Sequence, residues 1–80
     1  MNLSEIELSI IQHLSKTGGT GNVMAFLDFS VMDFEKAFSI ANEMQNKDLL
    51  KLLYSNFNTN QIVVEMTLIG YKASRINISK

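Results

Sequence analysis

The first stretch of the chain carries an apolar stripe with helical spacing. Its members are Leu3, Ile6, Ile10, Ile11 and Leu14. Apolar residues three and four positions apart share one side of a helix, so this stripe predicts an amphipathic helix. Ser4 followed by Glu7 is a capping-box pattern, and Thr17-Gly18-Gly19 is typical of a helix end. We therefore expect a helix over about residues 4–16.

A second helical region follows a glycine-rich loop at residues 18–21. Asn22 is a suitable N-cap for a short helix over about residues 22–28. Ser30 is a suitable N-cap for a longer helix over about residues 30–46, which carries a continuous apolar stripe. The members of that stripe are Phe34, Ala37, Phe38, Ala41 and Met44. The aromatic residues Phe26, Phe29, Phe34 and Phe38 are expected to pack in the core.

After Lys47 the period of the apolar residues changes from 3.6 to 2, which indicates β-strands. The segment 49–66 contains two stretches rich in strand-forming residues, separated by Asn56-Phe57-Asn58-Thr59-Asn60. Asparagine and threonine favour turns, so we expect a β-hairpin with a loop of four or five residues. Thr67 can then cap a last helix over about residues 67–77. The whole chain, residues 1–80, is expected to form one α+β domain that is mostly helical.

The residue types of the chain give little support to catalysis. The chain has no cysteine and one histidine, His13, with no paired carboxylates or metal-spaced cluster beside it. Nucleophilic, metal-assisted and histidine-based mechanisms therefore lack the groups they need. The glycines at 18–21 lack the Gly-Lys-Ser/Thr ending of a phosphate-binding loop. We expect no enzyme activity, no cofactor and no metal, and we expect His13 to be a packing or surface residue.

Charge is unevenly distributed along the chain, although the formal net charge is only −1. Residues 1–50 carry three lysines against seven carboxylates, whereas residues 51–80 carry four basic residues against Glu65. Affinity for a polyanion would therefore depend mainly on the second half of the chain. No stretch approaches the roughly 20 apolar residues of a membrane-spanning helix, and the N-terminus lacks a basic start. We expect a cytoplasmic protein without membrane contact.

Two short motifs give the chain a resemblance to a known fold family. Lys47-Asp48-Leu49-Leu50 leads into the expected hairpin, and Thr67-Leu68-Ile69-Gly70-Tyr71 leads out of it. In this order of elements, the sequence resembles small bacterial or phage winged helix-turn-helix proteins from about Ser4 to Ile76. The resemblance implies a three-helix core, a two-stranded wing and a C-terminal helix. It also implies a regulator that binds double-stranded DNA, often as a homodimer.

The resemblance places the helix from Ser30 in the DNA major groove and the hairpin loop against the DNA backbone or minor groove. At 100° per residue, the side of this helix opposite its apolar stripe includes the candidate contacts Met32, Glu35, Lys36, Ser39, Asn42 and Glu43. The candidate contacts of the wing are Lys51, Asn56, Asn58, Thr59, Asn60 and Gln61. Lys47 lies on the flank of the helix surface.

A second hypothesis is a winged-helix module that binds protein rather than DNA. The surface of the expected recognition helix has more acid than base, and phosphate repels carboxylates. The chain also has apolar positions that the core need not cover, which could contact a second copy or another protein. These candidate partner contacts are Leu8, Phe57, Tyr71 and Ile78. For Leu8, packing against Leu3 at the helix start is an alternative to a dimer contact.

Overall fold

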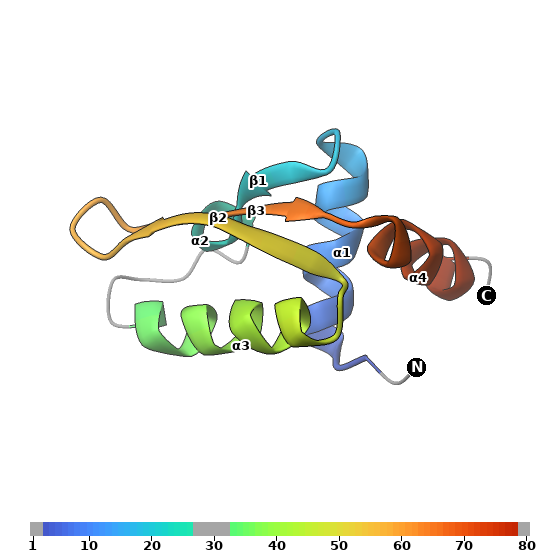
Figure 1. The fold of residues 1–80 in the computed structure, drawn as a ribbon, viewed down its shortest axis with the longest axis horizontal. Coiled ribbons are helices and arrows are strands. Elements are labelled where there is room, and N and C mark those ends of the chain that lie inside the picture. Colours follow the sequence, from blue (N-terminus) through green and yellow to red (C-terminus); the bar gives the residue numbers. More distant parts are fainter. Residues whose placement is uncertain (1–2, 27–32, 79–80) are drawn as a thin grey trace.

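A computed structural model describes residues 3–26 and 33–78 (Figure 1). Its elements follow the order helix, strand, two helices, two strands, helix. They are α1 (Glu5–Lys16), β1 (Thr20–Asn22), α2 (Val23–Phe26), α3 (Phe34–Asn46), β2 (Leu50–Asn56), β3 (Gln61–Met66) and α4 (Leu68–Ile78). The strands form an antiparallel sheet in the order β1-β3-β2. The expected α+β class, mostly helical, is confirmed in these coarse terms.

Helix α1 begins and ends where its local signals predict. Ser4 Oγ accepts a hydrogen bond from the Glu7 backbone N–H at 3.2 Å, and Glu7 Oε1 accepts one from the Ser4 backbone N–H at 3.0 Å. This reciprocal pair satisfies two N–H groups that the first helical turn would leave unpaired. At the other end, Gly18 and Gly19 have φ angles of 81° and 92°, a region that favours glycine. The chain can therefore leave the helix within two residues.

Strand β1 differs from the sequence prediction, which places a loop at residues 18–21. Its three residues pair with β3, with Thr20 opposite Glu65 and Asn22 opposite Val63. Three residues are too few to show the alternation of apolar and polar positions by which a strand is recognised in a sequence. The hydrogen-bonding edge of β3 makes this segment a strand. The hairpin is therefore part of a three-stranded sheet rather than an isolated ribbon.

Asn22 joins three parts of the fold through one side chain. As predicted, it caps α2, because its Oδ1 accepts from the Met24 backbone N–H at 3.1 Å. The same oxygen accepts from the Ile62 backbone N–H at 2.8 Å, and Nδ2 donates to the Asn60 carbonyl at 3.5 Å. The Asn22 amide thereby extends the contact between β1 and β3 towards the end of the hairpin.

Replacing Asn22 by alanine should lower the free energy of unfolding by about 2 kcal/mol, since the helix cap and the hydrogen bonds to Ile62 and Asn60 are lost together. Urea denaturation measures this loss. Asn22→Asp is the control for the accepting oxygen, because a carboxylate oxygen can still accept from both Met24 and Ile62, while the weaker 3.5 Å bond donated to Asn60 is lost. We expect Asp to retain most of the stability. Equal losses in the two variants would show that the accepting oxygen is not the important group.

Helices α2 and α3 flank residues 27–32, which lie outside the described part of the chain. The predicted N-cap Ser30, the predicted core residue Phe29 and the expected end of the short helix at residue 28 all fall there. Within the described residues, α3 begins at Phe34 after Asp33 at the N-cap position. It ends at Asn46, as its sequence predicts.

The β-hairpin is confirmed, with a four-residue turn between β2 and β3. Residues 57–60 form this hairpin turn, and Asn56 pairs with Gln61 at its base. Asn60 has a φ of 56°, which asparagine tolerates better than most residues. The register shifts between Leu52 and Tyr54, so that Leu53 is the extra residue of a β-bulge.

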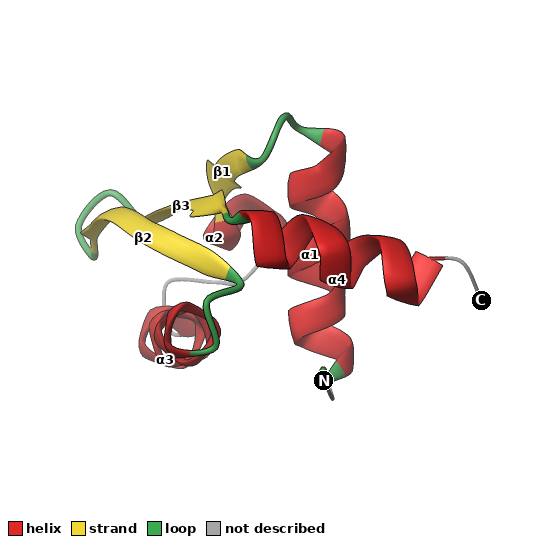
Figure 2. Ribbon diagram, turned by 45° about the vertical axis from the view of Figure 1, so that its right-hand side comes forward, coloured by secondary structure: helices red, strands yellow, loops and turns green. Residues whose placement is uncertain are grey.

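Thr67 caps α4 as predicted. Its Oγ1 accepts from the Gly70 backbone N–H at 3.1 Å, and its hydroxyl donates to the Asp48 carbonyl. The Thr67 backbone N–H also donates to the Leu49 carbonyl at 3.1 Å. These bonds tie the start of α4 to the segment that enters β2. Helix α4 then packs beside α1, and the two cross in Figure 2.

The core lies between the inner side of the sheet and the helices. Its fully buried large side chains are Ile10, Ile11, Leu14, Val23, Met44, Leu49, Leu50, Ile62 and Val64. Of the predicted aromatic core residues, Phe34 is buried, while Phe26 and Phe38 are half-buried against the core. Among the described residues, no helix has the length and apolar character needed to cross a membrane.

Candidate nucleic-acid interface

The exposed side of α3 follows the prediction from its apolar stripe. Phe34, Ala37, Ala41 and Met44 are buried, so the opposite side of the helix faces water. The predicted contact residues Glu35, Lys36, Ser39, Asn42 and Glu43 are all exposed. Met32, the sixth, lies outside the described residues. The helix thus presents a polar surface in which two carboxylates flank one lysine.

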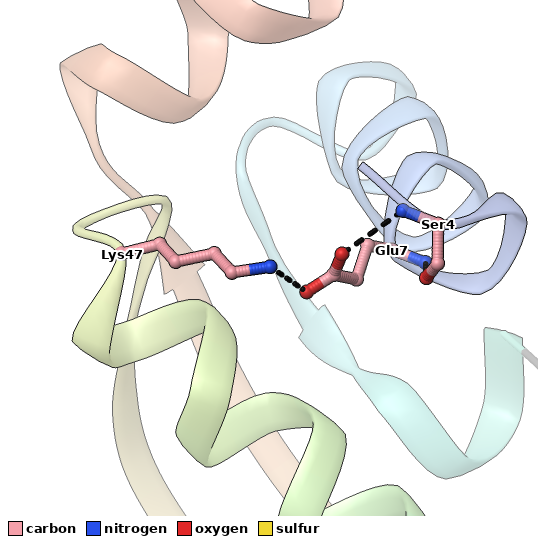
Figure 3. A network of polar contacts seen from close by, with 3 residues as sticks. All are labelled: Ser4, Glu7 and Lys47. Atoms are coloured by element: carbon pink, nitrogen blue, oxygen red, sulfur yellow. Dashed lines mark hydrogen bonds and ion pairs between the residues drawn. The ribbon is translucent and has the colours of Figure 1, made fainter. Parts of the chain in front are cut away.

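Lys47 does not add its charge freely to that surface. Its Nζ lies 2.8 Å from Glu7 Oε2, which joins the end of α3 to the first turn of α1 (Figure 3). Glu7 is only 5% exposed, although it is charged. The two residues lie 40 positions apart, so no local pattern in the sequence signals this ion pair. Lys47 is exposed at the end of α3, as its place on the flank predicts, but its charge is paired with the Glu7 carboxylate.

Opposing effects act on the Glu7 carboxyl. Burial raises the pKa of Glu7, because a charged group is less stable away from water. Hydrogen bonds from Lys47 and from Ser4, together with the positive charge of Lys47, lower it. The second set of effects is larger in total, so the pKa of Glu7 lies below its usual value of 4.5. Glu7 is therefore a buried, charged residue that links the first turn of α1 to the end of α3.

The hairpin turn is held by hydrogen bonds among its own polar residues. Asn56 Oδ1 accepts from the backbone N–H groups of Asn58 at 2.9 Å and Thr59 at 3.4 Å. Thr59 Oγ1 donates to Gln61 Oε1 at 2.8 Å. Asn56 and Gln61, predicted as DNA contacts, thus support the turn. Asn58 and Thr59 are exposed at its tip, while Asn60 is half-buried.

One ring contact brings the hairpin turn to the start of α3. Phe57, in the turn, meets Phe34, in the first turn of α3, edge to face with ring centroids 5.3 Å apart. Phe57 remains 54% exposed, so this contact covers only part of the ring. In Figure 1 the hairpin turn and the start of α3 lie at the same end of the molecule. The hairpin turn and the start of α3 are therefore direct neighbours.

Lys51 is not part of this end of the molecule. It lies near the start of β2, five residues before Asn56, or roughly 16 Å along the strand at about 3.3 Å per residue. It stands directly opposite Glu65 on β3, and both side chains are exposed. Lys51 is therefore an exposed residue of the hairpin, as predicted for the wing, but it lies away from the turn residues, and its role as a DNA contact stays a prediction.

The predicted partner contacts occupy different environments. Leu8 is half-buried on α1, and Phe57 is exposed at the hairpin turn. Tyr71 is half-buried against the core, and its hydroxyl lies above Gly19, where a Cβ would overlap it. Tyr71 therefore has an intramolecular role that its position on α4 did not reveal. Ile78 ends α4, and its side chain lies outside the described part.

Gln45 is a structural link between α3 and the hairpin. Its Oε1 accepts a hydrogen bond of 2.7 Å from the Leu52 backbone N–H. Since β2 is at the edge of the described sheet, this N–H has no strand partner on that side. Gln45 therefore attaches the last turn of α3 to the hairpin. A glutamine near the end of a helix carries no sequence signal for such a bond.

His13 has a surface packing role, as predicted. It is exposed on α1 and stacks on Phe26 with ring centroids 5.2 Å apart, and its Nδ1 lies 3.2 Å from the Ser9 carbonyl oxygen. Within residues 3–26 and 33–78, no group of three histidine or acidic side chains is placed to hold a metal ion. The α3 surface and the hairpin turn are thus the candidate site.

Comparisons with protein-family models, with curated proteins and with solved structures found no match to this chain. The function is therefore inferred from the geometry of the candidate site and from the order of the elements.

Proposed function

We propose that this chain is a small winged-helix protein that binds double-stranded DNA in the cytoplasm and regulates transcription as a dimer. The order of three helices, a β-hairpin and a closing helix supports this fold. The observation that carries the proposal is the contact between Phe34 and Phe57. It joins the start of α3 to the hairpin turn, so a helix and a loop can contact one duplex together.

In this proposal α3 lies in the major groove with its exposed polar surface towards the bases. Ser39 and Asn42 can donate to and accept from base edges, and Lys36 can contact a phosphate. A carboxylate such as Glu43 can accept a hydrogen bond from the N4 amine of cytosine. Asn58 and Thr59 at the hairpin turn can contact the DNA backbone. Residues 56–60 act as the wing.

The charges near the site predict weak non-specific binding. Lys47, at the end of α3, is paired with Glu7, so Lys36 is the lysine of the α3 surface that can meet phosphate. On the hairpin, Lys51 stands opposite Glu65. Each neutralised phosphate adds about 0.9 to the slope of log affinity against log salt concentration. We therefore expect a slope of about 1 to 3, well below that of strongly basic DNA-binding proteins.

Lys36→Ala should weaken binding to a random duplex and reduce the salt slope by about 1. Fluorescence anisotropy at about 50 mM and about 200 mM salt measures both quantities. Lys16→Ala is the matched control, because Lys16 is exposed at the end of α1 away from α3 (Figure 1). Glu43→Lys should strengthen non-specific binding. If neither the native protein nor Glu43→Lys binds at the lower salt concentration, the DNA proposal is wrong.

A second candidate function is a winged-helix module that binds another protein. The observation that favours it is the exposure of apolar side chains at the start of α4, where Leu68 is 70% exposed and Ile69 is 43% exposed. Exposed apolar groups that lie together are typical of protein interaction sites. Failure of DNA binding in a correctly folded protein would favour this function.

A further inference from the structure

The outer side of the β2–β3 hairpin is a surface that the proposed function does not use. On the inner side, Leu50, Ile62, Val64 and Met66 are buried against the core. Alternate residues point the other way, and among them Lys51 and Glu65 are exposed, while Val63 is half-buried. In Figure 1, α1 and α2 lie behind the sheet, on its inner side. Within the described residues, the outer side therefore presents exposed side chains that a partner can contact.

The β-bulge places two large apolar residues on this open side. In a regular strand Tyr54, three residues after Lys51, would point to the opposite, inner side. With the extra residue Leu53, Tyr54 stands opposite Val63 and faces outward. Leu53 is 49% exposed and Tyr54 is 48% exposed. Asn56 Nδ2 donates to the Tyr54 hydroxyl oxygen at 3.0 Å, which orients the ring. The hairpin thus presents an ordered apolar patch.

The charges beside this patch have both signs. Lys51 on β2 and Glu65 on β3 are direct cross-strand neighbours. Such a pair is a poor match for a polyanion, which attracts one sign only. It is a good match for a second copy of the same surface, because a two-fold axis exchanges the two strands.

We propose that the outer side of the hairpin is a two-fold interface with a second copy of this chain. The two-fold axis would run parallel to the strands, midway between the two packed sheets and above the line between β2 and β3. Lys51 then meets Glu65 of the partner subunit, and Tyr54 meets Val63 of the partner subunit. Face-to-face packing of two sheets at about 10 Å leaves room for these side chains. We call the set Lys51, Leu53, Tyr54, Val63 and Glu65 the hairpin interface.

A second copy would meet the outer side of this hairpin rather than its edge. The free edge of β2 is occupied at the Leu52 N–H by Gln45, and the bulge at Leu53 interrupts the edge next to it. Both features oppose the addition of another strand. The candidate DNA contacts on α3 are not part of the hairpin interface. The inference names the dimer surface of the proposed function, and it is tested without DNA.

Charge reversal gives a direct test of this interface. Lys51→Glu and Glu65→Lys should each weaken the dimer by about tenfold or more, because each places like charges opposite one another twice. An equimolar mixture of the two variants should form a heterodimer. The Lys51→Glu chain carries carboxylates at positions 51 and 65, and the Glu65→Lys chain carries lysines at both positions. Position 51 of each chain faces position 65 of the other, so both contacts again join opposite charges. Each chain still carries like charges within itself, so recovery can come only from contact between chains. Sedimentation velocity over a concentration series measures the dissociation constants.

Two further variants keep the test decisive. Leu53→Ser should weaken the dimer without changing the circular dichroism spectrum, because Leu53 is outside the core. Lys72→Glu, which changes an exposed lysine on α4, should leave the dimer unchanged. The inference is overturned if the native chain is monomeric at every concentration, or if the mixed variants fail to pair. It is also overturned if Leu68→Ser dissociates a dimer that both charge reversals leave intact. The DNA titration is independent, so either proposal can fail alone.

Discussion

Replacing Gly70 by alanine should lower the free energy of unfolding by roughly 3 kcal/mol, as expected when a group is forced into a filled space. Gly70 lies in the first turn of α4 and is buried. A Cβ at this position would overlap the Leu49 carbonyl oxygen and Met66 Cγ. The Leu49 carbonyl also accepts the Thr67 N–H, so moving it would disturb the junction of the hairpin and α4.

The sign of this effect separates tertiary packing from helix propensity. Glycine is about 1 kcal/mol less favourable than alanine inside a helix, so propensity alone predicts that Gly70→Ala stabilises the protein. Close approach of the Leu49 backbone predicts the opposite. Urea denaturation of Gly70→Ala beside Lys72→Ala, an exposed position on the same helix, measures the difference. A Gly70→Ala protein as stable as the native one would show that the backbone contact can relax without cost.

Glu7→Gln should lower the free energy of unfolding by about 2 kcal/mol at pH 7, because a hydrogen bond to a charged group is replaced by a weaker one. The effect should depend on pH. The pKa of Glu7 is lowered in the folded protein, so its charge stabilises the fold above the pKa of the unfolded chain. That stabilisation is lost as the pH falls through the lower, folded value. The difference between the native protein and Glu7→Gln should therefore shrink below about pH 4.

Urea denaturation between about pH 7 and about pH 3 tests this expectation. Glu5→Gln is the matched control, because Glu5 lies in the same helical turn and is exposed. Lys47→Met removes the other partner, and a double-mutant cycle with Glu7→Gln isolates the interaction energy of the pair. If Glu7→Gln shows the same pH dependence as the native protein, the Glu7 carboxylate does not contribute in the way the geometry indicates.

Elements whose signals lie within a few residues could be predicted from the sequence alone. Ser4 and Glu7 lie three positions apart, and both hydrogen bonds of the predicted capping box form between them. Turn-forming residues between two strand-like stretches predicted the hairpin, and Thr67 predicted the start of α4. The polar side of α3 followed from the 100° rotation between residues, because burial of one side of a helix exposes the other. Local spacing carries this information directly.

Contacts between distant groups emerged only when the elements packed together. Strand β1 forms because β3 lies beside it. Lys47 forms an ion pair with Glu7, which is 40 residues away in the sequence, and the Lys47 Nζ lies 2.8 Å from the Glu7 Oε2. Gly70 weakens a helix by propensity, yet the Leu49 backbone leaves no room for a larger residue. Pairings of this kind depend on how the elements pack in three dimensions. The spacing of residues along the chain does not specify that packing.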